Sequence, residues 1–189
     1  MISNAERILR ELDGHLDHEV TLVLYGRSAI ALGFANAPEA TKRSLDVDAI
    51  IPMTAVEAFR ADLKFWDAQE ATNRALEKEG LYITHLFEAK EVFLRRDWEK
   101  TLVPITSLPL RWLRLFRPAT LDLVLTKMMR GDDAQDMQDI AFLIEQEKIT
   151  ASQLEAAFDD VVIPDLVEYW DAFKTAKPRA LEIAKRFDS

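Results

Sequence analysis

The stretch VTLVLYGRSAIALG, residues 20–33, decides the fold. Val20 to Tyr25 is a nearly unbroken apolar run that stops at Gly26, which is typical of a buried central strand. Ser28 to Leu32 is small and apolar enough to form a helix that packs against that strand. The stretch therefore predicts a strand, a turn at the glycine and a short helix.

A second strand is predicted at DVDAII, residues 46–51, and Pro52 ends it. Residues two apart on a strand point to the same face, roughly 6.5–7 Å apart, so Asp46 and Asp48 project together. Two such carboxylates repel each other unless a cation lies between them. Mg²⁺ suits this position because it prefers oxygen ligands and keeps open positions for water and phosphate. The simpler alternative is an edge strand that carries two solvated aspartates.

The turn before the short helix makes a metal site at the acidic pair a stronger prediction. A strand, Gly26, the small hydroxyl residue Ser28 and then a helix form a turn that exposes backbone N–H groups at a helix N-terminus. Such a terminus is an anion site suited to phosphate oxygens. Nucleotidyl transfer needs both parts, because one holds the triphosphate and the other holds the metals that bridge it to the attacking hydroxyl.

Both motifs resemble those of a known superfamily. LYGRSAIALG at residues 24–33 and KRSLDVDAII at residues 42–51 are similar to the glycine motif and acidic pair of polymerase β-type nucleotidyltransferases. The form is most similar to the AbiEii group and its short relatives, with Arg43 and Ser44 matching the residues before the acidic pair. TLDLVLTKMMRGDDAQDMQDIAFLI at residues 120–144 also resembles a later motif of that group. The resemblance covers about two thirds of the chain.

The resemblance implies the α/β nucleotidyltransferase fold, a small mixed sheet with a C-terminal helical part. It also implies an NTP-binding protein that depends on Mg²⁺ or Mn²⁺ and modifies a hydroxyl of RNA or of a partner protein, as a toxin–antitoxin component would. The implied site consists of metal-binding and catalytic Asp46 and Asp48, catalytic Lys127 and Asp136, and nucleotide-binding Gly26, Arg27, Ser28, Arg43, Ser44 and Lys127.

Two departures from the family pattern favour a protein without catalytic activity. Arg27 stands where the motif has a second Gly or Ser, and it either binds phosphate or blocks the pocket. A third carboxylate on a following strand has no clear equivalent; the candidates are Glu88 and Glu91, with His85 nearer mid-strand. The alternative is therefore a catalytically inactive binding protein with the same fold, an antitoxin or a scaffold.

Two later positions each have two interpretations. Lys127 follows Leu123 and Val124 on a predicted helix, so it either extends its ammonium from an apolar face to solvent or contacts phosphate, as the resemblance implies. Asp136 and Asp139 are one helical turn apart. Either they place favourable charge in a first turn, or Asp136 has a polar role near Lys127.

Residues 95–117 carry six basic residues and only two acidic ones, in a chain whose formal net charge is −9. This excess either marks where an RNA backbone lies, since phosphate contacts come mainly from Arg and Lys, or belongs to a solvated strand face whose arginines cover apolar surface.

The remaining strands are expected between the second strand and the helical part. Residues 82–87 and 91–94 are predicted to pair as a hairpin around residues 88–90. Strand-like pieces near residues 102–105 and 110–116 would complete a mixed sheet.

After Pro118 the pattern changes to helices only, and Thr150 with Gln153 forms a capping box for one of them. The predicted division is residues 1–117 for a nucleotidyltransferase-like α/β core and residues 118–189 for a helical part that completes the cleft.

Composition limits the classes of function. The 189 residues include no cysteine, which excludes disulfides, thiolate zinc sites and cysteine nucleophiles. The net charge argues against a protein that coats nucleic acid non-specifically, and it suits a site that gathers cations. The sequence shows no signal-peptide pattern and no apolar run of membrane-spanning length, so we expect a cytoplasmic protein that does not bind membranes.

Overall fold

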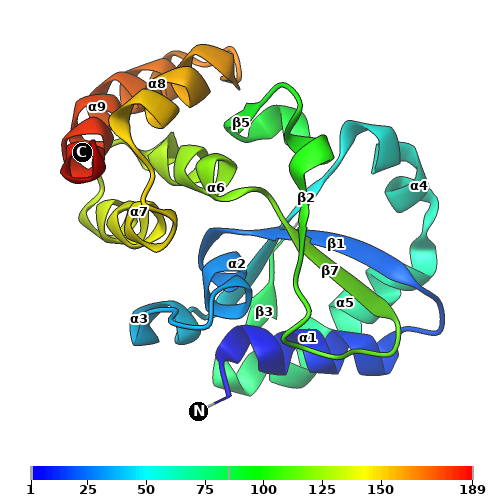
Figure 1. Ribbon diagram of the computed structural model, residues 1–189. Helices are drawn as coiled ribbons and strands as arrows, with labels where there is room; N and C mark the ends of the chain where they lie inside the picture. The colour runs from blue at the N-terminus through cyan, green and yellow to red at the C-terminus, as the bar shows by residue number, and fades with distance from the viewer. Residues whose placement is uncertain (1, 85, 189) are drawn as a thin grey trace. The chain divides into compact units, whose positions relative to one another are not determined.

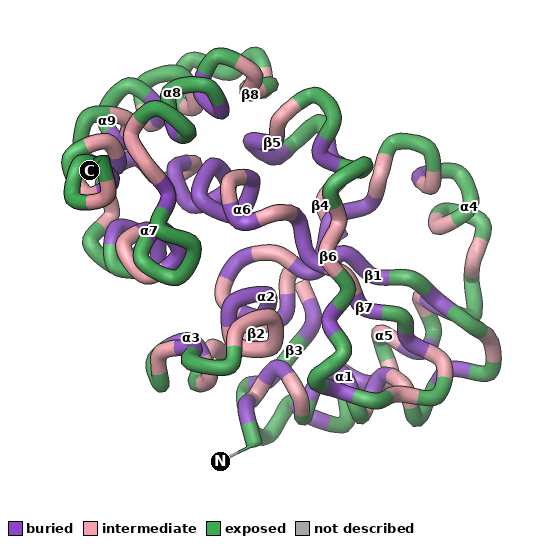
Figure 2. The backbone as a smooth tube through the Cα atoms, in the orientation of Figure 1, coloured by how far each residue is buried: buried purple, intermediate pink, exposed green. Residues whose placement is uncertain are grey.

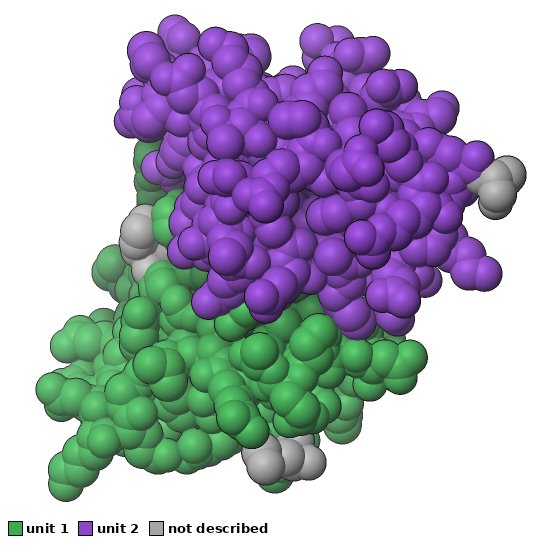
Figure 3. All heavy atoms as spheres, turned by 90° about the vertical axis from the view of Figure 1, so that its left-hand side faces the viewer, with its two compact units in different colours: residues 1–88, 103–117 green, residues 89–102, 118–189 purple. Residues whose placement is uncertain are grey.

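The computed structural model of the chain describes residues 2–84 and 86–188, which belong to two compact units. Unit 1 consists of residues 1–88 and 103–117, and unit 2 consists of residues 89–102 and 118–189 (Figure 3). One division lies after residue 117, where the pattern changes to helices, but residues 89–102 belong to the helical unit. The fold class is the predicted one, a mixed sheet in an α/β arrangement followed by C-terminal helices.

Strand β1 (Val20–Tyr25) lies inside the sheet of unit 1, whose order is β3-β2-β1-β7-β6 with β4 also paired to β2 (Figure 1). It pairs antiparallel with β2 and parallel with β7, and Leu22, Val23 and Leu24 are buried, which confirms the predicted central strand. The expected strand pieces after residue 102 are also confirmed, since β6 and β7 pair antiparallel. The other strands are β2 (Asp46–Ile51), β3 (Tyr82–Ile83), β4 (Phe87–Glu88), β6 (Val103–Pro104) and β7 (Leu113–Arg117).

The helices of unit 1 support this sheet. The hydroxyl of Ser3 accepts a hydrogen bond from the Glu6 amide and caps the first helix, whose residues Ile8, Leu9 and Leu12 are fully buried. The short helix after β1 contacts both β1 and β2, as its small apolar sequence predicts. These helices are α1 (Asn4–His15), α2 (Gly26–Gly33), α3 (Glu39–Lys42), α4 (Val56–Ala61) and α5 (Leu63–Leu76).

The predicted hairpin of residues 82–87 and 91–94 is wrong. Strands β3 and β4 both pair in parallel with β2, one after the other along the same strand. Strand β5 (Leu94–Arg95) instead pairs antiparallel with β8 (Val161–Val162) in unit 2.

Long-range packing explains why residues 89–102 belong to unit 2. Phe93 is completely buried, and its ring packs edge-on against the rings of Tyr169 and Phe173 at centroid distances of 5.4 and 6.2 Å. Arg95 donates three hydrogen bonds, from its backbone N, Nε and Nη2, to the completely buried carboxylate of Asp122. Neither contact is visible in the local alternation on which the hairpin prediction depended.

Unit 2 is mainly helical, and helix α6 is one of its most buried elements (Figure 2). The carboxylate of Asp133 caps the next helix, and the Thr150–Gln153 capping box is confirmed. Among the helices of the described residues, none is long and apolar enough to cross a membrane. The helices of unit 2 are α6 (Thr120–Lys127), α7 (Ala134–Glu147), α8 (Ala151–Asp160) and α9 (Val167–Ala184).

Candidate active site

Asp46 and Asp48 lie at the start of β2 and are half-buried, whereas the residues that alternate with them, Val47 and Ala49, are completely buried. This alternation puts the two carboxylates on one strand face. Ser44 Oγ donates to Asp46 Oδ1 at 2.7 Å, so a hydroxyl on the preceding residues orients the first carboxylate.

Thr84 orients the second carboxylate, because its Oγ1 donates to Asp48 Oδ1 at 2.7 Å. Thr84 is not among the site residues predicted from the sequence. It reaches Asp48 because β3 pairs in parallel with β2, with Tyr82 beside Asp46. The signal available in the sequence was a lone hydroxyl residue directly after a short strand, which is too common to be informative without that pairing.

Gly26 brings the turn at the end of β1 directly against Asp48. Its φ is +63°, in the left-handed region that glycine tolerates, and a Cβ at this position would lie 3.3 Å from Asp48 Oδ2. The strand register pairs the preceding residue, Tyr25, with Asp48. The predicted phosphate turn and the predicted acidic pair are therefore adjacent within unit 1.

The first turn of α2 presents backbone amides next to this carboxylate. Tyr25 is the N-cap residue, and no side chain among the described residues caps the helix. The Ser28 hydroxyl is buried and donates to the Tyr25 carbonyl at 2.9 Å, so it stabilises the turn from inside. The donors that this turn can offer to phosphate are hence its amides rather than the serine hydroxyl.

Two arginines belong to the same unit as the aspartates. Arg27, in the first turn of α2, is half-buried, and its Nη1 donates a long hydrogen bond of 3.4 Å to the Ala40 carbonyl. Arg43 is exposed at the end of α3, and its carbonyl accepts a hydrogen bond from Asn4 Nδ2 at 3.3 Å. The long, exposed bond of Arg27 contributes little, so this side chain can exchange it for a stronger anionic partner, whereas the Asn4 bond of Arg43 engages only its backbone.

The donor chemistry of Asp46 and Asp48 fits Mg²⁺ or Mn²⁺. Both divalent cations prefer carboxylate oxygens, and Mg²⁺ is usually held by one or two carboxylates together with water and substrate phosphates. Within residues 2–84 and 86–188, no group of three or more His, Cys, Asp or Glu residues could hold a metal. A cation here would therefore take the rest of its coordination from water and from phosphate oxygens.

Of the candidates for a third carboxylate, Glu88 belongs to the same unit as this pair and does not join it. Glu88 pairs with Ile51, which alternation puts on the strand face opposite to Asp48, and its Oε1 accepts from Arg60 Nη2 at 2.7 Å. Glu91 belongs to unit 2. His85 lies outside the described residues.

Lys127 and Asp136 lie together in a buried ionic cluster of unit 2. Lys127 Nζ lies 3.1 Å from Asp136 Oδ1 and 2.8 Å from Asp139 Oδ2, and the lysine is only 8% exposed. Arg130 Nε donates to Asp136 Oδ2 at 2.6 Å, and this bond raises the pKa of the Arg130 guanidinium. The interpretation in which Lys127 extends to solvent is wrong, because two aspartates of α7 hold its ammonium inside the unit.

The basic residues of the segment 95–117 are divided between the two units, and contacts within their own unit engage most of them. Arg95 pairs with the buried Asp122, and Arg117 is buried with its guanidinium 4.3 Å from the centre of the Phe34 ring. Lys100 pairs with Asp97, Arg111 lies over the Trp112 ring and Arg114 pairs with Glu19. Arg111 and Arg117 thus cover aromatic rings, as the second interpretation of this segment predicts.

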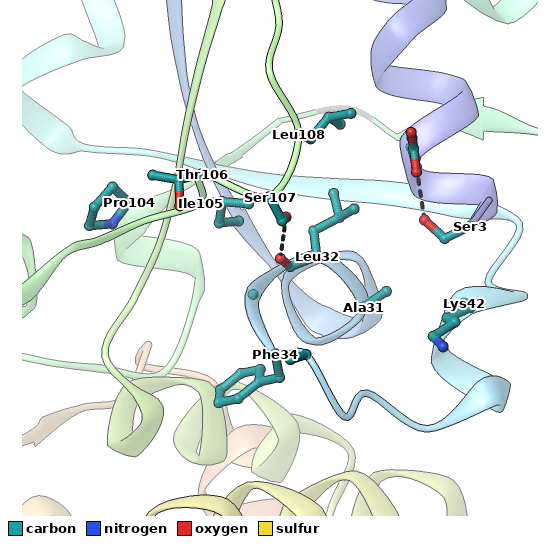
Figure 4. A pocket seen from close by; sticks show the side chains of 13 residues that line it. Ser3, Ala31, Leu32, Phe34, Lys42, Pro104, Ile105, Thr106, Ser107 and Leu108 are labelled. Atoms are coloured by element: carbon teal, nitrogen blue, oxygen red, sulfur yellow. Dashed lines mark hydrogen bonds between the residues drawn. The ribbon is translucent and has the colours of Figure 1, made fainter. Parts of the chain in front are cut away.

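A pocket of about 360 Å³ lies at the other end of α2, between its last turn and the segment 104–108 (Figure 4). Ser107 Oγ donates to the Leu32 carbonyl across it at 2.7 Å. None of the residues predicted for the nucleotide site lines this pocket. Since an eight-residue helix is about 12 Å long, the pocket is separate from the Gly26 turn.

The comparisons with known proteins support the nucleotidyltransferase superfamily. A family model described as "Nucleotidyltransferase of unknown function (DUF6036)" matches residues 2–172, which is most of the chain. Neither the curated proteins nor the solved structures contain a match to the chain.

Proposed function

The chain belongs to this nucleotidyltransferase family, and we propose that it binds an NTP with Mg²⁺ or Mn²⁺ at Asp46 and Asp48 and transfers the nucleotidyl group to a hydroxyl. One observation carries the proposal: a Cβ at Gly26 would lie 3.3 Å from Asp48 Oδ2. A phosphate-binding turn is useful to a metal site only if the two are in contact, and here the absence of a side chain at Gly26 lets the turn approach the carboxylate closely.

The proposed roles follow from the positions of the groups. The amides in the first turn of α2 bind the triphosphate, and Arg27 replaces its long bond to Ala40 with a charge-assisted bond to a phosphate oxygen. Ser44 and Thr84 hold the carboxylates of Asp46 and Asp48 in fixed orientations, which lowers the cost of assembling the site. A bound divalent cation would neutralise phosphate charge and polarise the α-phosphoryl group.

The transfer itself is a displacement at the α-phosphorus. The acceptor hydroxyl oxygen forms a bond to that phosphorus, and the bond from the phosphorus to the oxygen shared with the β-phosphate breaks. Pyrophosphate leaves with the electron pair, and the hydroxyl proton passes to solvent water. Asp46 and Asp48 would contribute by holding the divalent cation that binds the phosphate oxygens, while Arg43 supplies positive charge from the same unit.

The acceptor in this proposal is a hydroxyl of RNA or of a protein. Similarity to the AbiEii group motivates that choice and the further proposal of a toxin–antitoxin component. Lys127 and Asp136, the other two residues predicted to be catalytic, belong to the ionic cluster of unit 2. In this proposal they keep the partners that they have in that cluster.

One observation favours a second candidate, a binding protein without turnover. Glu88 is turned to the opposite strand face from Asp48, so among the described residues of unit 1 the predicted candidates supply no third carboxylate. A protein that binds NTP through two aspartates and lacks the base to activate a hydroxyl would be an antitoxin or a scaffold.

Incubation with each labelled NTP, Mg²⁺ and total RNA distinguishes the two candidates. Transfer of label to RNA or to protein, lost in Asp46→Asn/Asp48→Asn, supports the enzyme. NTP binding without transfer supports the binding protein. If neither NTP binding nor transfer depends on these aspartates, the proposed site is wrong.

A further inference from the structure

Exposed apolar residues gather at the start of α9. Of the nine exposed large apolar residues described, four lie within residues 162–170: Val162, Leu166, Val167 and Trp170, exposed by 49, 47, 76 and 44%. Val167 and Trp170 are three apart on the helix and so are neighbours, and the N-cap residue Leu166, whose carbonyl accepts a hydrogen bond from the Trp170 amide, lies beside them.

This surface is distinct from the buried side of the same helix. Tyr169 packs edge-on against Phe93, and Phe173 packs against both Phe93 and Phe158. The core of unit 2 therefore occupies one side of α9, and Leu166, Val167 and Trp170 remain on another. An exposed tryptophan flanked by two exposed aliphatic residues on a helix is a typical arrangement of a protein-binding surface.

The charges around this surface are mostly negative. Residues 149–173 include six acidic residues and no basic residue, and Lys174 follows on the same side of α9, one turn after Trp170. Asp165 and Glu168, beside the apolar residues, are both exposed. Asp171 lies 3.7 Å from Lys174, so these two charges cancel and the negative field comes from Asp165 and Glu168.

We propose that this surface, defined by Asp165, Leu166, Val167, Glu168 and Trp170 and called the α9 surface, binds a basic amphipathic helix of a partner protein. Such a helix would lay apolar side chains on Trp170 and Val167 and direct Lys or Arg to the acidic residues. The net charge favours this occupant. Asp165, Glu168 and Asp171 outnumber Lys174, so a second copy would bring two net negative surfaces together across a two-fold axis, and nucleic acid and anionic membranes would be repelled for the same reason.

The test uses the full chain and a fluorescein-labelled synthetic helix of about 16 residues, with Lys and Arg on one face and Leu on the other. An otherwise identical helix with Glu in place of Lys and Arg is the control for charge. Fluorescence anisotropy measures binding to wild type, Trp170→Ala, Val167→Ser and Asp165→Asn/Glu168→Gln. Leu63→Ala and Asp67→Asn/Glu77→Gln are matched controls with exposed residues of unit 1.

We expect the basic helix to bind and the acidic helix not to bind. Trp170→Ala should weaken binding by at least about tenfold, as expected for a central aromatic contact. The Asp165→Asn/Glu168→Gln variant should weaken binding and reduce its salt dependence, and the controls should stay within about twofold of wild type. Val167→Ser should also weaken binding, and it keeps the test valid if Trp170→Ala does not fold, because Val167 is mostly exposed.

Three results would overturn the proposal. One is equal binding of the acidic and basic helices. Another is binding that none of the α9 surface variants weakens. The third is self-association in sedimentation velocity that Trp170→Ala abolishes, which would assign the surface to a second copy of the chain.

Discussion

Replacement of Gly26 by alanine tests the contact between the turn and Asp48. At φ +63° an L-residue costs about 1–2 kcal/mol, and alanine recovers about 0.4–1 kcal/mol by restricting the unfolded chain. The expected loss of stability is therefore about 1 kcal/mol, or a fall of about 2–4 °C in Tm for a chain of this size. The new methyl group would also contact Asp48 Oδ2 at 3.3 Å, so the carboxylate or the turn must shift.

Gly80 provides a matched control, because its φ is +67° and a Cβ there would meet nothing within 4 Å. Gly80→Ala should therefore lose similar stability and keep nucleotide binding. Gly26→Ala should lose about 10–100-fold in affinity for Mn²⁺ with NTP, the usual effect of disturbing the groups that orient metal ligands. Urea unfolding followed by circular dichroism measures the first quantity, and isothermal titration calorimetry measures the second. Equal affinities for the two variants would refute the argument from contact.

Three further substitutions, two in unit 1 and one in unit 2, should change the stability of the protein. His18 donates hydrogen bonds to Asp62 and to Asp17, and these raise the pKa of its imidazole, the bond to Asp62 more strongly. Its stabilising contribution is therefore complete below pH 6.5 and declines as pH rises through the higher folded pKa; thermal melts from pH 5 to 9 should show this decline in wild type and not in His18→Gln. Lys127→Met should lower the free energy of unfolding by about 3–5 kcal/mol, because Asp136 and Asp139 stay buried without their shared cation. Lys100→Met, at an exposed ion pair, is the control and should change the free energy of unfolding little. Equal urea unfolding curves for the Lys127→Met and Lys100→Met variants would contradict the buried cluster. Gly14→Ala, near the end of α1 with open space around its Cβ, should raise stability by up to about 1 kcal/mol in urea unfolding, and a loss would mean that α1 needs the glycine.

The sequence predicted those parts of the fold that depend on local pattern. The apolar run before Gly26 and the acidic strand ended by Pro52 both formed as expected, because their burial follows from composition within six residues. The capping box at Thr150 is equally local.

The failures concern contacts between distant segments. Strands β3 and β4 are two residues long, so their parallel pairing with β2 leaves no periodic signal, and Thr84 beside Asp48 was missed with them. Residues 91–94 look like a hairpin strand in isolation, but Phe93 and the neighbouring Arg95 find their partners on helices of unit 2.

The candidate site shows the same division. The spacing of Asp46 and Asp48 was enough to predict that they share a strand face, since side chains alternate along any strand. The partners of Lys127 were not predictable in detail. A residue on one helix and two residues on the next can meet in several ways, and only the packing of α6 on α7 selects the pair of aspartates.

The most direct test of the central claim is a thermal-shift measurement with Mn²⁺ and each NTP in turn. A ligand that binds only the native state raises Tm with the logarithm of its concentration relative to Kd, and at 100 times its Kd it stabilises by about 2.7 kcal/mol. We predict a rise for wild type with at least one NTP, and none for Asp46→Asn/Asp48→Asn, whose amide oxygens can still accept the bonds from Ser44 and Thr84. The control Asp67→Asn/Glu77→Gln should shift like wild type. An equal shift in the Asp46→Asn/Asp48→Asn variant, or no shift in wild type with any NTP, would contradict the assignment of these aspartates to a metal–nucleotide site.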